Sequence, residues 1–143
     1  MASRNATKLI QQIMKRVTSV RGFDKNLSKL QIVSAGDGKC TAEMTVDEEH
    51  QNRQGTLHAG LTTTLVDIVS ANAYFSTKPE DVHMPVSVDI NVVFMNAAKV
   101  GTHIVIEADT LKMGKKFAFY KVDISNKDTG MLIATGSHTL YVG

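Results

Sequence analysis

Apolar residues recur with the period of a helix in two segments of the chain. Near the N-terminus they fall on one face of a helix expected over about residues 5–19: Leu9, Ile10, Ile13, Met14 and Val17. Residues 57–75 are apolar almost all round and too numerous for one buried strand. This second segment therefore predicts a helix that is buried on most of its faces.

Alternation of apolar and polar residues predicts strands in most of the remaining chain. It is regular over residues 39–46, and Asp37-Gly38 is typical of a tight turn from a preceding strand over 28–35. The second half holds four further stretches with this pattern: 85–95, 102–112, 116–125 and 131–142. Loops are expected where polar residues and prolines gather: 47–56 and 76–84.

This order of elements, α-β-β-α-β-β-β-β, predicts an α+β fold. One very apolar helix among long antiparallel strands is most economically buried when the sheet wraps around it. The chain has 143 residues, which is the size of a single domain over 1–143. Such a sheet leaves an exposed edge strand, and we expect this edge to pair with a second copy of the chain.

Charge and cysteine content narrow the possible partners. The chain has 16 Lys and Arg against 14 Asp and Glu, a net charge of +2, so nucleic acid is not expected as a partner. Cys40 is the only cysteine, which excludes an internal disulfide and favours a reducing compartment. No apolar run reaches the ~18 residues that a bilayer requires, so no membrane span is expected.

The N-terminal segment is basic. It contains no acid before Asp24, and its basic residues are interspersed with Ser and Thr: Arg4, Lys8, Lys15, Arg16 and Arg21. This is the composition of a mitochondrial targeting segment. An ordinary amphipathic helix has the same composition, so cytoplasmic and mitochondrial localisation are both open.

Several common catalytic motifs are absent from the sequence. There is no G-x-S-x-G, which argues against a hydrolase of the Ser-His-Asp elbow type. There is no G-x-x-x-x-G-K-[ST] or G-x-G-x-x-G, so a nucleotide-binding loop is not supported. The five histidines lack H-x-x-x-H spacing and one cysteine cannot form a thiolate cluster, so we expect no metal site.

Asp67 is the main chemical anomaly of the apolar helix. It is the only acid between Glu49 and Glu80, and an unpaired buried carboxylate is costly unless it is hydrated, paired or neutral. Burial also raises the pKa of a carboxyl group toward the range useful for a general base. Asp67 is therefore a candidate catalytic residue, and the alternative is a structural acid that pairs with a strand lysine.

Small residues open the same helix. The segment 52–60, Asn-Arg-Gln-Gly-Thr-Leu-His-Ala-Gly, lets a ligand approach free backbone N–H groups that, with the helix dipole, can hold an oxyanion. The alternative is plain capping by Thr56, and a lone histidine such as His58 is usually structural. Ala59 precedes Asp67 by ~12 Å along the helix axis. If both act on one group, the site is therefore shared between two subunits.

Lysines flank a glycine in the turn expected after residue 112: Lys112, Gly114, Lys115 and Lys116. A further lysine, Lys99, follows an Asn-Ala-Ala sequence. Clustered lysines suit phosphate groups. A solvated hairpin tip explains the same residues equally well, so both interpretations are open.

These residues together resemble the hot-dog fold thioesterases, in particular the phenylacetyl-CoA-thioesterase-like branch. The family signature is an Asn, then a Gly, then Leu-His-Gly-Gly at the start of the central helix, with an acid downstream. Here it reads Asn52, Gly55, Leu57-His58-Ala59-Gly60 and Asp67. The likeness covers nearly the whole chain, including the N-terminal helix, 85–89, 97–101 and the turn at Asn126.

The resemblance implies a hot-dog fold and hydrolysis of medium- or long-chain acyl-CoA to free acid and CoA. Coenzyme A would be part of the substrate, and no cofactor is implied. The N–H of Ala59 would polarise the thioester carbonyl, and Asp67 of the neighbouring subunit would activate the attacking water with help from Ser87. Asn52 and His58 would position the thioester and support the oxyanion.

The resemblance also implies a set of residues that contact coenzyme A: Phe94, Met95, Asn96, Ala97, Lys99, Lys112, Gly114, Lys115 and Lys116. The family assembles as a homotetramer, a dimer of dimers, which agrees with a shared site. A lipid-transfer protein is a partner that the resemblance alone suggests. Members of the family are associated with both cytosol and mitochondria.

Two positions depart from the family pattern. Ala59 replaces the first Gly of the Gly-Gly pair, which keeps the N–H but adds a methyl beside the thioester. Asn96-Ala97 replaces the usual Ser-Pro of the CoA loop. The alternatives for function are a hot-dog dehydratase or hydratase and a module that binds acyl-CoA without cleaving it. For Asp67, a covalent anhydride is the alternative to general-base catalysis.

Overall fold

The computed structural model of the chain describes residues 2–78 and 83–143, with side chains in the first helix from residue 4 onward. The described elements are, in chain order, α1 (Ala2–Ser19), η1 (Phe23–Leu27), β1 (Gln31–Gly36), β2 (Lys39–Thr45), η2 (Glu48–His50), α2 (Ala59–Thr77), β3 (Val86–Phe94), β4 (His103–Met113), β5 (Phe117–Asn126) and β6 (Leu132–Tyr141). The predicted helices and strands are present, with ends that differ by a few residues.

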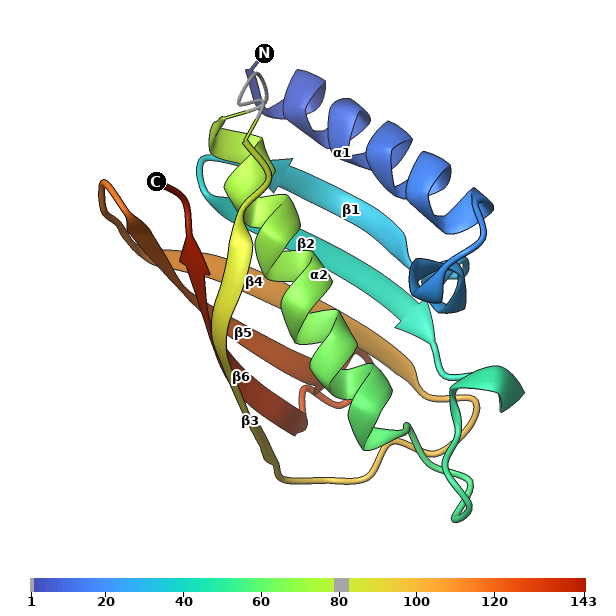
Figure 1. The fold of residues 1–143 in the computed structure, drawn as a ribbon. Coiled ribbons are helices and arrows are strands. Elements are labelled where there is room, and N and C mark those ends of the chain that lie inside the picture. The colour runs from blue at the N-terminus through green and yellow to red at the C-terminus, as the bar shows by residue number, and fades with distance from the viewer. Residues whose placement is uncertain (1, 79–82) are drawn as a thin grey trace.

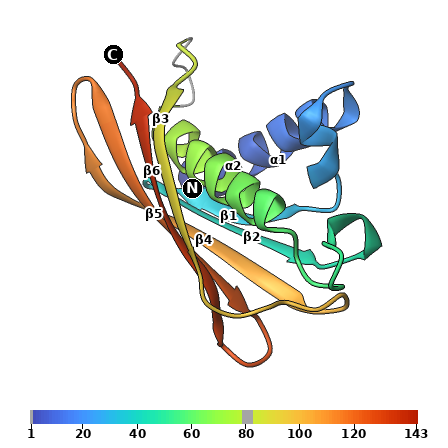
Figure 2. The ribbon, with the colours of Figure 1, turned by 60° about the horizontal axis from the view of Figure 1, so that its bottom comes forward.

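The six strands form an antiparallel sheet in the order β1-β2-β4-β5-β6-β3. Figure 1 shows this sheet curving around α2, and Figure 2 shows α2 lying across its inner face with α1 beside β1. The predicted α+β arrangement, a long antiparallel sheet wrapped around one apolar helix with an additional N-terminal helix, is confirmed.

Two of the predicted boundaries differ from the structure or extend beyond its described residues. The strand expected from residue 28 begins at Gln31, because backbone hydrogen bonds to the carbonyls of Lys25 and Leu27 hold the preceding residues in a turn. The expected loop 76–84 is only partly visible, since 79–82 lie outside the described residues.

The core lies between α2 and the inner face of the sheet. Buried side chains of α2, such as Leu65 and Val69, share one apolar cluster with inward-facing strand residues such as Ala42, Ile106 and Val122. The strand residues are apolar positions of the alternating pattern, and burying each Val, Leu or Ile side chain of the cluster contributes ~1.5–3 kcal/mol relative to exposure. The pattern thus fixes which face of each strand receives the helix.

Gly136 lets α2 come close to β6. A Cβ at this position would lie 2.8 Å from Cγ2 of Val66 and 3.2 Å from the carbonyl oxygen of Asn91. Such distances are too short for non-bonded atoms, which pack at ~3.5–4.0 Å when both are carbon. The missing side chain therefore allows the middle of α2, including Asp67, to lie directly over β6 and β3.

The two edges of the sheet differ in whether other parts of the chain bond to their backbone groups. At β1, the side chain of Thr7 in α1 accepts from the N–H of Ala35 at 3.0 Å and donates to its carbonyl at 3.1 Å, and Gln11 donates to the carbonyl of Ile32 at 2.8 Å. At the other edge, β3 has a neighbouring strand on one side only, among the strands described. Four of its apolar side chains are exposed: Val86, Val88, Val93 and Phe94. Strand pairing with another chain is therefore open at β3.

α1 is amphipathic, as predicted, and it is packed against the body of the protein. Ile10 and Met14 are buried in the core, whereas the basic residues of the helix are exposed. Neither α1 nor any other helix in the described part of the chain is both long and apolar enough to cross a bilayer.

Candidate active site

The N–H of Ala59, at the start of α2, is not used by the helix. His58 is the N-cap, and its Nδ1 accepts a hydrogen bond from the N–H of Gly60 at 2.9 Å. The carbonyl of His58 accepts the N–H of Thr62 at 2.9 Å, which begins the helix. Among the described residues, no group accepts from the N–H of Ala59. The alternative of a cap by Thr56 is wrong, and His58 itself leaves Ala59 free.

Asn52 shapes the loop that leads into the helix. Its Oδ1 accepts from the N–H groups of Gln54 at 2.9 Å and Thr56 at 3.2 Å, and its Nδ2 donates to Oγ1 of Thr56 at 2.9 Å. Gly55 has φ 76°, a left-handed conformation that glycine adopts without strain. Asn52 is therefore held rigidly, with one amide hydrogen still available for a ligand.

A hollow of about 300 Å³ joins the helix start to the loop after β3. It is lined by eleven residues: Asn52, Thr56, Leu57, Ala59, Thr62, Phe94, Met95, Asn96, Ala97, Ala98 and Ile133. The N–H of Leu57 donates to the carbonyl of Ala98 at 2.8 Å, and Thr56 forms a β-bridge with Lys99, so the two segments are tied together. The structure thus places Asn52 and Ala59 beside four of the residues expected to contact coenzyme A.

Asp67 lies further along α2, where the helix faces the open edge of the sheet. Its side chain is 39% exposed. The carboxylate is therefore accessible to water, which is one of the states expected for it, because β3 ends the sheet and no described residue beyond β3 covers this part of the helix. The alternative of an ion pair with a strand lysine is wrong, since in the described residues the ionisable group beside this carboxylate is the imidazole of His138.

A histidine and a serine lie beside this carboxylate, and a second serine contacts the histidine. Oδ1 of Asp67 is 3.5 Å from Oγ of Ser87 and 3.8 Å from Nε2 of His138. Nε2 of His138 is 2.9 Å from Oγ of Ser87, and its Nδ1 is 2.6 Å from Oγ of Ser70. The expected association of Asp67 with Ser87 is therefore observed. His138 was not predicted, although the alternation in 131–142 places it on the inward face of its strand.

His138 is a neutral imidazole at neutral pH. Burial lowers its pKa, and the carboxylates of Asp67 and Asp89 oppose this effect in part. A neutral ring donates from one nitrogen and accepts at the other. If Ser70 donates to Nδ1, then Nε2–H donates to Ser87, whose hydroxyl is free to donate to Asp67. If Ser70 instead donates to the carbonyl of Val66, 2.7 Å away, the hydrogen bonds run the other way: Ser87 donates to Nε2, and Nδ1–H donates to Ser70.

The remaining residues expected to bind coenzyme A lie elsewhere in the chain. Lys112, Gly114, Lys115 and Lys116 form the hairpin between β4 and β5, at the end of the sheet opposite to Lys99 (Figure 1). β4 alone spans eleven residues, or ~35 Å. One subunit therefore does not bring the hairpin to the hollow beside Ala59.

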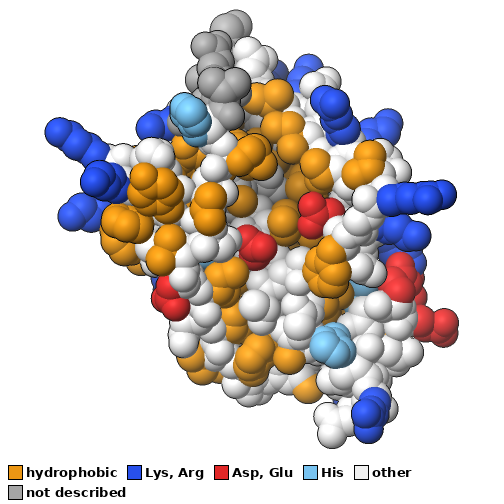
Figure 3. All heavy atoms as spheres, viewed as in Figure 1, with side chains coloured by type: hydrophobic (Ala, Val, Ile, Leu, Met, Phe, Trp, Pro, Cys, Tyr) orange, Lys and Arg blue, Asp and Glu red, His pale blue; other side chains and the backbone are white. Residues whose placement is uncertain are grey.

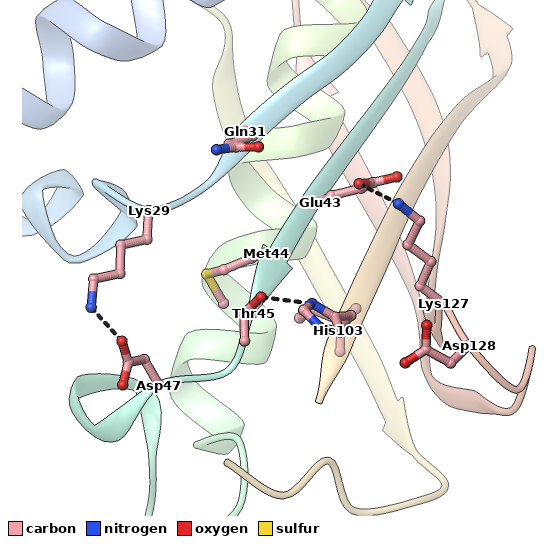
Figure 4. A pocket seen from close by; sticks show the side chains of 10 residues that line it. Lys29, Gln31, Glu43, Met44, Thr45, Asp47, His103, Lys127 and Asp128 are labelled. Carbon is pink, nitrogen blue, oxygen red and sulfur yellow. Dashed lines mark hydrogen bonds and ion pairs between the residues drawn. The ribbon is translucent and has the colours of Figure 1, made fainter. Parts of the chain in front are cut away.

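Other polar features of the structure lie away from these groups. A polar hollow of about 520 Å³ on the outer face of the sheet includes Lys29, Asp47, Glu43, His103 and Lys127, and most of its charges are paired (Figure 4). In residues 2–78 and 83–143 no three His, Cys, Asp or Glu side chains are placed to hold a metal ion. Cys40 is buried, and burial raises the pKa of its thiol to about 12, so it is not a nucleophile.

Comparison with known proteins agrees with this geometry. The sequence pattern of the Thioesterase superfamily matches residues 54–133, which include Ala59, Asp67 and Ser87. Human acyl-coenzyme A thioesterase 13 is 48% identical to the chain, over 96% of each sequence. The crystal structure of zebra fish thioesterase superfamily member 2 is 45% identical and superimposes with a TM-score of 0.91, covering 96% of this chain and 98% of that one. For the mouse protein of the same name the TM-score is 0.86, at 45% identity and 96% and 97% coverage.

The sheet wrapped around α2 is thus a hot-dog fold, as the resemblance implied. The free N–H at the helix start and the acid eight residues later fall within the matched segment. On both sequence and structure, the chain belongs to the thioesterase superfamily.

Proposed function

We propose that the protein hydrolyses the thioester bond of medium- or long-chain acyl-CoA, with water as co-substrate and a carboxylic acid and free CoA as products. The observation that carries the proposal is the free N–H of Ala59 in a hollow at the N-terminus of α2, combined with an accessible carboxylate further along the same helix. The names of the human relative and of the solved zebra fish and mouse structures support the reaction class.

In this mechanism Ala59 polarises the thioester. Its N–H, at the positive end of a helix of 19 residues, donates to the carbonyl oxygen and stabilises the negative charge that develops as water attacks. Asn52 supplies a second donor from its free amide hydrogen. His58 is a positioning residue. Its Nδ1 accepts from the N–H of Gly60, which holds the start of the helix in place and leaves the N–H of Ala59 free for the substrate.

Asp67 activates the attacking water. Its exposed carboxylate can accept a proton from water, and Ser87 with His138 holds the carboxylate and the water in line. The proton then passes to the CoA thiolate as the C–S bond breaks, which regenerates the carboxylate. In a single turnover in ¹⁸O-water, label in the Asp67 carboxylate would show an anhydride that water opens at the aspartyl carbonyl, because general-base catalysis places all of the label in the product acid.

The active site is shared between subunits in this proposal. Ala59 and Asp67 are ~12 Å apart along α2, too far for one thioester group to contact both in one chain. If two subunits pair through their β3 strands about a two-fold axis, the two β3 strands are antiparallel. The N-terminus of α2 in one subunit then lies beside the side of α2 that carries Asp67 in the other. The same symmetry brings the lysines of one hairpin toward the hollow of the partner.

The assembled site accounts for the whole substrate. Lys99 and the hairpin residues Lys112, Lys115 and Lys116 would bind the phosphates of coenzyme A as point charges. Gly114 permits the turn, since a Cβ there would lie 2.8 Å from the carbonyl oxygen of Phe117. The apolar side chains of β3 would line the acyl chain between subunits, and two such dimers would form the tetramer.

A mixing experiment tests both the chemistry and the sharing. Ala59→Pro removes the N–H at the first helical position, where proline is tolerated, and His58 already has the extended ψ of 133° that precedes a proline. We expect this variant to fold and to lose ~10²–10³ in kcat. Asp67→Ala should also fold and lose ~10²–10⁴. Ala59→Gly, which keeps the N–H, is the matched control and should retain or raise activity.

Mixed refolding of the two inactive variants then gives a clear outcome. A heterodimer of Ala59→Pro and Asp67→Ala has one site with both native groups, so a 1:1 mixture should recover about a quarter of wild-type CoA release. No recovery would show that each chain acts alone. Wild-type release by Asp67→Ala would refute the role of Asp67 as the base. No CoA release by the wild-type protein, across acyl chains from acetyl to palmitoyl, would refute the proposed function itself.

A further inference from the structure

The positive charge of the protein is concentrated at one end of the sequence. The first 23 residues hold five basic residues and no acid, whereas the other 120 hold eleven basic residues and 14 acids. Three of the five, Arg4, Lys8 and Lys15, fall within ~40° of one another around α1. They are exposed, and none forms an ion pair with another described residue. Figure 3 shows Lys and Arg side chains along α1, with a second group at the left of the view.

A hollow of about 550 Å³ lies between this basic stripe and β1. Arg4, Lys8 and Lys39 line it together with Val33, which is 49% exposed, and Asp37 is its only acid. Lys39 is 3.5 Å from Asp109, so the charge at the hollow that remains unpaired comes mainly from α1. The hollow therefore combines cations suited to a phosphate with an exposed aliphatic side chain.

Apolar side chains are also exposed where α1 ends. Val20 is 55% exposed and Phe23 is 66% exposed; Arg21 lies between them in sequence, and Asp24 and Lys25 follow Phe23. An exposed aromatic ring beside cations can stack on the bases of a single-stranded nucleic acid, and it is also typical of a surface that meets the boundary between phospholipid headgroups and acyl chains. The exposed aliphatic side chain of Val33 beside the cations of the hollow favours the phospholipid surface.

We propose that the α1 face of the protein docks on an anionic phospholipid surface. The apolar side of α1 remains packed on β1, so the helix is held as a rigid basic ridge instead of inserting into the bilayer. Arg4, Lys8 and Lys15 contact lipid phosphates, the hollow receives a headgroup, and Val33 and Phe23 reach the interface. None of these residues lies in the candidate active site, so the proposal is independent of the proposed hydrolysis.

Vesicle co-sedimentation tests the proposal with the full chain. The wild type should bind phosphatidylcholine vesicles that contain phosphatidylglycerol, and should bind pure phosphatidylcholine vesicles far more weakly. Each basic residue near an anionic surface changes the affinity about fivefold, so Arg4→Gln, Lys8→Gln and Lys15→Gln together should reduce it about a hundredfold. The charge-matched control is Lys112→Gln, Lys115→Gln and Lys116→Gln, which should bind vesicles within a few-fold of the wild type. Binding should weaken steeply as salt is raised to ~0.5 M.

Several results would overturn the proposal. They are equal affinity for neutral and anionic vesicles, equal loss in the two triple variants, or binding of soluble glycerol phosphate without any binding of vesicles. Circular dichroism of the α1 triple variant checks that it is folded, because loss of structure would also lower vesicle binding. In that case Phe23→Ser, an exposed single change, should still lower anionic-vesicle binding several-fold.

Discussion

Replacing Gly136 by alanine should destabilise the fold by ~1–3 kcal/mol. The added Cβ would lie 2.8 and 2.9 Å from the two methyl groups of Val66, whose side chain is fully buried. Carbon atoms pack at ~3.5–4.0 Å, so either α2 moves away from β6 by several tenths of an ångström or Val66 leaves its rotamer. Because Asp67 follows Val66, the first movement also separates Asp67 from His138.

Urea unfolding at a fixed protein concentration measures this effect in a double-mutant cycle. Val66→Ala alone should cost ~1.5–3 kcal/mol through lost burial and a cavity. In the double variant the new methyl of residue 136 enters the space that Val66 leaves, so the two costs should fall short of additivity by ~1 kcal/mol or more. The rescue is partial, because the carbonyl oxygen of Asn91 still lies 3.2 Å from the new Cβ. Ser137→Ala, on the outer face of the same strand, is the control and should stay within ~0.5 kcal/mol.

Two outcomes would refute the reasoning. Full additivity within ~0.5 kcal/mol would show that residues 66 and 136 do not compete for the same space. A Gly136→Ala variant as stable as the wild type would show that α2 is not held at the described distance. If the geometry is right, the single variant should also lose hydrolysis through kcat, and Val66→Ala should restore part of it.

His138 stays neutral in the folded protein, whereas in the unfolded chain its imidazole takes up a proton below a pKa near 6.5. The free energy of unfolding should therefore fall as the pH drops from 7 to 5. In urea titrations, His138→Gln should reduce this dependence on pH, and an unchanged dependence would contradict the prediction. Cys40, whose pKa is raised to about 12, should not react with a thiol reagent at pH 8 until the protein unfolds, and rapid native labelling would count against its burial. Thr7→Val with Gln11→Ala should lower the free energy of unfolding by ~1–3 kcal/mol, because backbone groups at the outer edge of β1 lose their hydrogen-bond partners. The same variant should self-associate in sedimentation velocity, because that edge can then pair with another chain. Wild-type stability and association would show that these side chains do not protect the edge.

The fold could be predicted from the sequence because the helical and the strand repeat of apolar residues are both strong and both local. The alternation from residue 39 onward placed the strands, and Asp37-Gly38 predicted the observed turn, where Asp37 has φ 53° and Gly38 has φ 76°. Residues 57–75 predicted the central helix to within two positions at each end. Such patterns require no knowledge of the tertiary structure.

The candidate site was predicted less completely because it depends on contacts between distant segments. A helix that is apolar all round suggested that Asp67 is buried, but which side of α2 remains open depends on where the sheet ends. His138 meets Ser70 across 68 positions and Ser87 across 51, so nothing near it in the sequence marks it as part of the site. The capping role of His58 likewise required the observed backbone at the helix start.

The difference between the two sheet edges limits how the protein can polymerise. An edge strand that pairs with its own copy by a two-fold axis is used up by that contact, and the resulting double sheet ends in two β1 strands. Thr7 and Gln11 occupy the outward backbone groups of β1, so no third sheet can be added there. Growth by edge pairing therefore stops at two chains, and an indefinite cross-β ribbon is blocked by one helix and two polar side chains.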